Sequence, residues 1–332
     1  MDPCYLPDGR IVFGSTASYQ SVPCWHGQKR VAHLYLMHAD GSGVRQLCYD
    51  QDHDFHPVVL PTGQVLYHRW DYTGPSHIYV RPLMAMNPDG TEQRQYLGGG
   101  DYWPNAVFYA RPCPGDPGKT IGIVTGHHGV KRMGELVLFD RNRPGKGVSS
   151  AVQRIPGYGK KVEPIIRDAL VNNSWPRFLH PYPLSGKYFL TSCQLNAKSP
   201  WGVYLVDVFD NMLCLKKRDA GGGYYEPIPL RKTKRPAIMP DRINLASKEA
   251  TVLVNDIYVG PGLQGVPRGT VKRLRLYRYE YGPRHKGGHY AMGMETCWDS
   301  KQMLGTVPVE QDGSASFIVP ANQPFSMQPL DE

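Results

Sequence analysis

Residues 6–15 read LPDGRIVFGS, a tight turn followed by a short apolar strand that ends in a small residue. Similar stretches are LPTGQVLY at 60–67 and PLSGKYFLTS at 183–192, and a looser copy, PGDPGKTIGIV, lies at 114–124. The turn glycines of successive copies are 54, 55 and 68 residues apart. Self-similarity at such a period indicates a repeat architecture, in which each unit buries its apolar face against its neighbours.

A second apolar stretch and a polar turn follow the first copies. LYLM at 34–37 leads into ADGSG at 39–43, and MAM at 84–86 leads into NPDGT at 87–91. The Asp-Gly segments supply the positive-φ residues that tight hairpins require. Each unit therefore predicts a small antiparallel sheet. The series predicts the blades of a β-propeller, which repeat at about 40 to 50 residues, here with loop insertions.

We therefore predict an all-β chain in two parts. Residues 1–236 form a partial β-propeller with blades of the TolB or WD40 kind. This part opens in the middle of a repeat and holds about four units, so either further blades lie outside the chain or the four close unusually. Residues 237–332 lack the blade pattern. Their strands, with a hairpin turn at 312–314, predict a β-sandwich-like module that is truncated at its C-terminal end.

Composition agrees with many short strands and excludes several classes of protein. The 332 residues include 36 Gly, 30 Pro and 21 Tyr, a balance that favours strands joined by turns. No apolar run approaches the roughly 20 residues of a membrane-spanning helix, and the start of the chain has no signal-peptide pattern. The seven cysteines form no CxxC or CxxCH motif, so we expect no disulfide framework, zinc ribbon or covalently attached haem.

The formal net charge is +9, with basic clusters at 231–235 and 272–278. In the second cluster, Leu274 and Leu276 share one face of the expected strand, and the other face carries Arg273, Arg275, Tyr277 and Tyr279. We interpret these clusters as solvated faces, and we predict no nucleic-acid partner because no RNA- or DNA-binding module is present. The chain also lacks a nucleophile elbow, a zinc-protease motif, a P-loop and a dinucleotide fingerprint.

Two loops are candidate metal sites. His127 and His128 lie between glycines in the segment 126–129, where paired imidazoles on an exposed turn can reach a metal ion or a haem edge. Cys24 lies two residues before His26, and a thiolate beside an imidazole can bind zinc. The alternative interpretations are structural hydrogen bonding for the two histidines and a buried, unreactive thiol for Cys24.

A third candidate is the segment 50–56, DQDHDFH. Asp52, Asp54 and His56 offer oxygen and nitrogen ligands that suit a divalent cation such as zinc or calcium. Aspartate and histidine also form hydrogen bonds at the corners of blades, so a structural role is the alternative interpretation of this segment.

Several segments together resemble the hydrazine synthase alpha-subunit-related proteins of planctomycetes. The similarity spans essentially the whole chain, and each segment is weak alone. The segments are YLPDGRIVF at 5–13, NPDGT at 87–91, GHHG at 126–129, RIPGYGK at 154–160, FLHPYPLS at 178–185, YLVDVFDN at 204–211, GVPRGTVK at 265–272 and LGTVPV at 304–309.

The resemblance implies a periplasmic or otherwise extracytoplasmic protein with a propeller-like region. In the family's named enzyme, which makes hydrazine from nitric oxide and ammonia, covalent haems lie outside the propeller. Their CxxCH segments have no counterpart here, so haem is expected only on segments outside the chain or on a partner. The family relation also implies that other subunits or domains of a redox complex are the partners.

Three hypotheses about function remain open. The first is a propeller module that is not itself catalytic and serves as a scaffold or interface in a haem-containing redox assembly. The second is a propeller that binds carbohydrate or peptide through aromatic loops, at 102–103, Trp175 and 224–225. The third is a metal-dependent enzyme with a histidine-lined channel site.

Overall fold

A computed structural model describes most of the chain: residues 2–22, 28–70, 81–98, 104, 106–126, 132–143, 147–158, 169–219, 221–282 and 299–332. Within these residues the protein is all-β, as predicted, with two short 3-10 helices, η3 at Gly147–Ser150 and η4 at Pro261–Leu263, and no α-helix. No helix in the described part is long and apolar enough to cross a membrane. The chain separates into two compact units, the first comprising residues 1–18, 32–48 and 52–241, and the second 19–31, 49–51 and 242–332. The predicted boundary between 236 and 237 stays a prediction.

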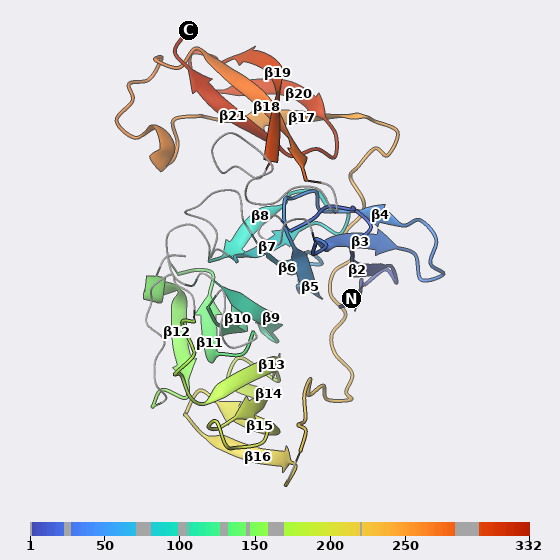
Figure 1. The fold of residues 1–332 in the computed structure, drawn as a ribbon, viewed down its shortest axis with the longest axis vertical. Coiled ribbons are helices and arrows are strands. Elements are labelled where there is room, and N and C mark those ends of the chain that lie inside the picture. Colours follow the sequence, from blue (N-terminus) through green and yellow to red (C-terminus); the bar gives the residue numbers. More distant parts are fainter. Residues whose placement is uncertain are drawn as a thin grey trace. The chain divides into compact units, whose positions relative to one another are not determined.

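The first unit contains four successive four-stranded antiparallel sheets, each in simple chain order (Figure 1). This is the propeller-like arrangement that the repeat predicted. The strands are β1 (Cys4–Tyr5), β2 (Ile11–Ser15), β3 (His33–Met37) and β4 (Arg45–Gln46); β5 (Asp54–Val59), β6 (Val65–Arg69), β7 (Leu83–Met86) and β8 (Arg94–Leu97); β9 (Val107–Cys113), β10 (Asp116–Val124), β11 (Glu135–Asp140) and β12 (Ala151–Ile155); and β13 (Arg177–Pro183), β14 (Tyr188–Gln194), β15 (Gly202–Asp207) and β16 (Met212–Lys217).

The repeated turn joins the first strand of a sheet to the second. In the first sheet the amide of Gly9 donates to the carbonyl of Leu6 at 3.0 Å, and in the second sheet Gly63 donates to Leu60 at 2.9 Å. Both glycines have positive φ, 93° and 89°, which a residue without a Cβ adopts at little cost. The two similar stretches of sequence therefore form the same local structure.

Buried apolar clusters join each sheet to the next. One cluster combines Leu34 of the first sheet with Tyr67 of the second, and another combines Leu83 of the second with Val137 of the third. A third cluster extends from the third sheet to Phe178 and Phe189 of the fourth. Because the sheets stack in this way, their first strands β1, β5, β9 and β13 lie next to one another. We call these four the inner strands.

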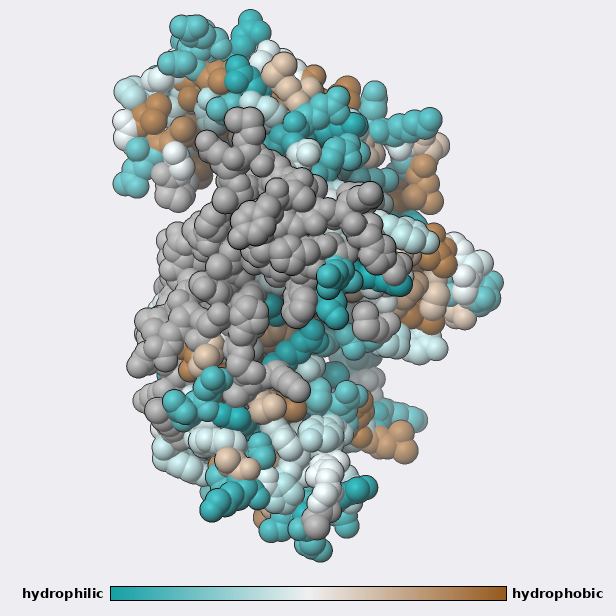
Figure 2. Space-filling view, in the orientation of Figure 1, coloured by the Kyte–Doolittle hydropathy of each residue, from teal (hydrophilic) through white to brown (hydrophobic). Residues whose placement is uncertain are grey.

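The described residues of the second unit form two small sheets. Strand β17 (Glu249–Val254) pairs with β20 (Ala315–Pro320), and β18 (Arg273–Tyr281) lies between β19 (Asp299–Pro308) and β21 (Phe325–Leu330). Leu274 and Leu276 are buried, as the alternation in β18 predicted. Hydrophilic and hydrophobic side chains are mixed on the visible surface (Figure 2).

Candidate functional site

Five residues with left-handed backbone lie at or near the inner strands. Asp2 lies two residues before β1, and Glu226 belongs to a segment after β16 without regular secondary structure. We call Asp2, His56, Tyr109, His180 and Glu226 the inner five; their φ angles are 50°, 53°, 52°, 49° and 52°. A non-glycine residue in this region costs about 1–3 kcal/mol, and such residues cluster at functional sites.

A β-bulge produces this conformation in three of the inner strands. In β5, two residues, His56 and Pro57, lie opposite the single residue Tyr67 of β6. Register shifts of the same kind occur at Tyr109 in β9 and at His180 in β13. A bulge leaves a residue outside the hydrogen-bond ladder and re-aims its side chain.

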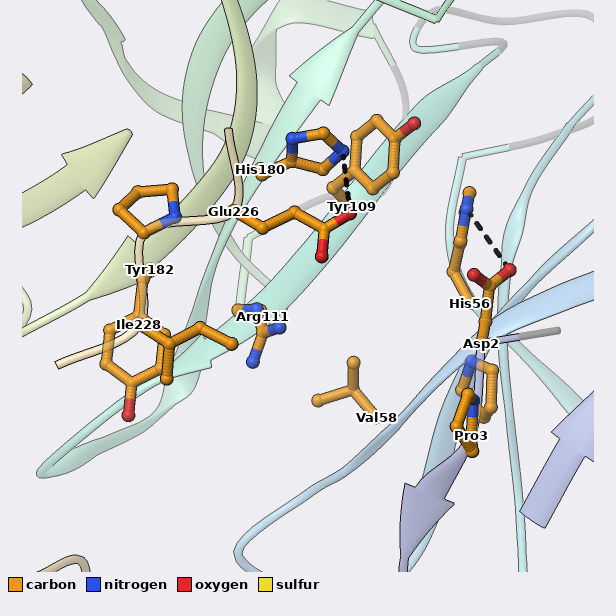
Figure 3. Close-up of a pocket in the computed structure, with 12 residues that line it drawn as sticks. Asp2, Pro3, His56, Val58, Tyr109, Arg111, His180, Tyr182, Glu226 and Ile228 are labelled. Carbon is orange, nitrogen blue, oxygen red and sulfur yellow. Dashed lines mark ion pairs between the residues drawn. The ribbon is translucent and has the colours of Figure 1, made fainter. Parts of the chain in front are cut away.

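The inner five line one cavity of about 320 Å³. Residues two positions further along the chain complete its wall, including Val58, Arg111 and Tyr182. Figure 3 shows the side chains arranged around this cavity, with an ion pair at either end. All of the lining residues belong to the first unit. The fold therefore brings two imidazoles, two carboxylates and one phenol to one place.

The inner five form a continuous arc of contacts. Nε2 of His56 lies 3.5 Å from Oδ2 of Asp2, and Nε2 of His180 lies 3.8 Å from Oε1 of Glu226. The ring of Tyr109 is between the two imidazoles, with ring centroids 4.6 Å from His56 and 4.4 Å from His180. Each end of the arc is thus a histidine and carboxylate pair, and an aromatic ring separates the pairs.

Burial keeps the imidazoles of this arc neutral at neutral pH. It lowers the pKa of His56 to about 4, although the carboxylate of Asp2 acts in the opposite direction. Burial also lowers the pKa of His180, against the effect of Glu226. The Nδ1 atoms of both histidines are buried and have no hydrogen-bond partner among the described residues. A neutral imidazole keeps one ring nitrogen with a lone pair, which can bind a cation.

The structure separates the predicted ligands of the segment 50–56. Asp54 is fully buried, and its Oδ1 accepts a hydrogen bond from Nε of Arg69 at 2.9 Å. Asp52 is also fully buried, which raises the pKa of its carboxyl well above the usual value. His56 lines the cavity. Among the described residues, these three side chains do not form one group of ligand atoms within 4.8 Å.

The other candidates give less information. Cys24, His127 and His128 lie outside the described residues, so their metal-binding roles stay predictions. The sulfur of Cys48 lies within 4.8 Å of a carboxylate oxygen of Asp54, but Arg69 already pairs with that carboxylate.

Sequence reasoning missed four of the inner five as members of a site. Asp2, Tyr109, His180 and Glu226 were not among the predicted site residues. A signal was present, because proline follows Asp2, His56, His180 and Glu226. This pattern is hard to recognise because the residue before the proline changes from copy to copy.

Comparison with known proteins agrees with the fold described above. Residues 269–332 match the family model of the hydrazine synthase alpha subunit middle domain. This part of the chain is therefore similar to the hydrazine synthase alpha subunit. Hydrazine synthase of Kuenenia stuttgartiensis has the same fold over 97% of this chain, with a TM-score of 0.69 and 15% identity. The chain spans only 48% of that solved chain.

Two other solved structures are similar over smaller parts of the chain. An oligogalacturonate lyase in complex with manganese is 18% identical, with a TM-score of 0.38 over 62% of this chain and 47% of its own. A puromycin hydrolase mutant is 17% identical, with a TM-score of 0.40 over 65% of this chain and 30% of its own. No curated protein matches the sequence.

Proposed function

We propose that the chain is the propeller module of a larger extracytoplasmic protein related to the hydrazine synthase alpha subunit. Its four sheets are consecutive blades, and β17–β21 form a sandwich-like module. The module is not itself catalytic. It is a scaffold or interface for a haem-containing redox assembly, and its inner strands carry a polar site beside the propeller axis.

One observation carries this proposal. The fold of hydrazine synthase accounts for nearly the whole chain, while the chain accounts for about half of that relative. Such unequal coverage is expected when a chain is one module of a longer polypeptide. The sequence adds a second argument, because it contains no CxxCH motif, and a c-type haem needs that motif for attachment.

The test compares the full-length gene product with the 332-residue chain. The tagged full-length protein is purified from the cells that make it, and the chain alone is produced with c-type cytochrome maturation proteins. We expect the full-length protein to leave the cells with the periplasmic fraction, to elute in an assembly larger than a monomer, and to show a Soret band. The chain alone should show none.

Each measurement addresses one part of the proposal. A full-length protein without a Soret band would remove the redox assembly. A monomeric full-length protein would remove the scaffold role, and retention in the cytoplasmic fraction would remove the extracytoplasmic location.

A second candidate function is metal binding at the histidine and carboxylate pairs of the inner five. Two ligand atoms that share a tetrahedral zinc ion at about 2.1 Å lie about 3.4 Å apart. The 3.5 Å between His56 and Asp2 is close to this value, and the 3.8 Å between His180 and Glu226 is somewhat longer. Because the ring of Tyr109 lies between the imidazoles, each pair would bind its own ion, with water completing the coordination.

Calorimetric titration with zinc tests this candidate. The wild-type chain should bind two ions, and His56→Ala and His180→Ala should each lose one. His38→Ala, which removes an exposed histidine on a turn, is the matched control and should bind as the wild type does. Unchanged stoichiometry in both site variants would exclude metal at the inner five.

A further inference from the structure

A second cavity in the first unit has a different chemical character. Its volume is about 700 Å³, and it shares Val58, Arg111 and Tyr182 with the cavity of the inner five. We call it the basic cavity, because five of its described lining residues are Arg or Lys and none is Asp or Glu. These five are Arg111, Arg231, Lys232, Lys234 and Arg235.

The segment 231–237 is attached by hydrogen bonds to the turns that join the first two strands of three sheets. A guanidinium nitrogen of Arg231 donates to the carbonyl of Leu184 at 3.3 Å in the fourth sheet. Nε of Arg235 donates to Pro7 at 2.8 Å in the first sheet, and the amide of Ala237 donates to Pro61 at 3.2 Å in the second. The side chains of Arg231 and Arg235 are therefore held in place before any ligand binds, which lowers the entropic cost of binding.

Arg111 lies where the two cavities meet. Its guanidinium carbon is 5.4 Å from the centre of the Tyr182 ring, and it makes no ion pair with any residue in the described part of the chain. Burial lowers the pKa of this guanidinium. Burial of a cation is costly, and the carboxylate of Glu226 offsets this cost only through space. A bound carboxylate would add two parallel hydrogen bonds.

The remaining wall of the basic cavity indicates what kind of anion it holds. Val59, Leu184 and several prolines line it, so much of its surface is apolar. A single inorganic oxyanion would leave that surface uncovered, whereas an organic anion with a carbon skeleton would contact it. Five cations in a wall that contains no Asp or Glu also favour more than one negative charge on the ligand.

We infer that the basic cavity binds a small organic polycarboxylate. One carboxylate pairs with Arg111, a second lies between Lys232 and Lys234, and the carbon skeleton contacts the apolar wall. This site does not depend on the redox assembly or on metal at the inner five. The inference can therefore be tested separately from those two proposals.

Citrate is the probe, with inorganic phosphate and acetate as comparisons, all titrated calorimetrically into the 332-residue chain at constant ionic strength. The variants are Arg111→Gln and the double replacement of Lys232 and Lys234 by Gln. The matched control replaces Lys216 and Lys217 by Gln, because it removes the same charge from the exposed strand β16. Circular dichroism confirms that each variant is folded.

We expect citrate to bind the wild type more tightly than phosphate or acetate. Affinity should fall about tenfold in Arg111→Gln and in the Lys232/Lys234 variant, as the loss of charge-assisted hydrogen bonds predicts. The Lys216/Lys217 control should keep the wild-type affinity. If both double variants lost the same citrate affinity, the effect would come from net charge alone. If phosphate bound as tightly as citrate, the cavity would be an inorganic anion site. Either result overturns the inference.

Discussion

The two units bury their strands in different ways. In the first unit, strands such as β6 and β11 are buried along almost their whole length, because neighbouring sheets cover them. In the second unit, β20 alternates between buried Phe317 and exposed Ile318, whose side chain is 61% accessible. A sheet covered on both faces has continuous apolar runs, and a sheet covered on one face has a period of two. The stacked sheets of the first unit can therefore enclose cavities between their inner strands.

The largest expected effect comes from a substitution between the stacked sheets. Phe189 in β14 is fully buried in the cluster that joins the third and fourth sheets. Phe189→Ala should lower the free energy of unfolding by about 3–5 kcal/mol, since it removes apolar contacts and leaves a cavity. Ile318→Ala in the second unit should change it by less than about 0.5 kcal/mol. Urea unfolding followed by circular dichroism measures both values.

Phe317→Ala is the matched control for the second unit, because Phe317 is the inward-facing neighbour of Ile318 in the same strand. It should destabilise the protein, whereas Ile318→Ala should not. If Ile318→Ala were as costly as Phe189→Ala, the outer face of β20 would be covered and the contrast between the units would disappear.

A smaller effect is expected at a bulge of the inner strands. Gly122 in β10 lies opposite Tyr109 and Ala110, and a Cβ at this position would lie 2.6 Å from Cγ1 of Val107. Gly122→Ala should therefore cost about 1–3 kcal/mol through overpacking, measured as a lower thermal midpoint. Gly186→Ala is the control, because a Cβ there meets no atom within 4 Å. Equal midpoints for the two variants would show that the bulge tolerates the added methyl group.

The sequence predicts local structure better than it predicts the site. The turn around Gly9 and its copy around Gly63 could be predicted because a few adjacent residues determine a tight turn. The cavity of the inner five could not, because it depends on which strands become neighbours when the sheets stack. His56 was identified as a metal ligand, but with Asp52 and Asp54 as its partners, whereas its neighbours in the structure are Asp2 and Tyr109.

The smallest predicted effect concerns pH and a buried histidine of the first unit. Nδ1 of His68 donates to the carbonyl of Val107 at 2.9 Å, and the ring stacks against Phe55. Burial lowers the pKa of His68 well below the usual value of 6.5. Because the unfolded chain then binds a proton that the folded chain excludes, stability should fall as the pH drops below about 6.5.

His68→Gln isolates this contribution. Between about pH 7.5 and pH 5.5, the variant should lose about 1.4 kcal/mol less free energy of unfolding than the wild type, because one buried histidine no longer titrates. Urea unfolding at the two pH values gives the difference, and the absolute stability of the variant does not affect it. If His68→Gln kept the wild-type pH dependence, a proton would be able to bind His68 inside the stacked sheets, and the close covering of both sheet faces would be wrong at this position.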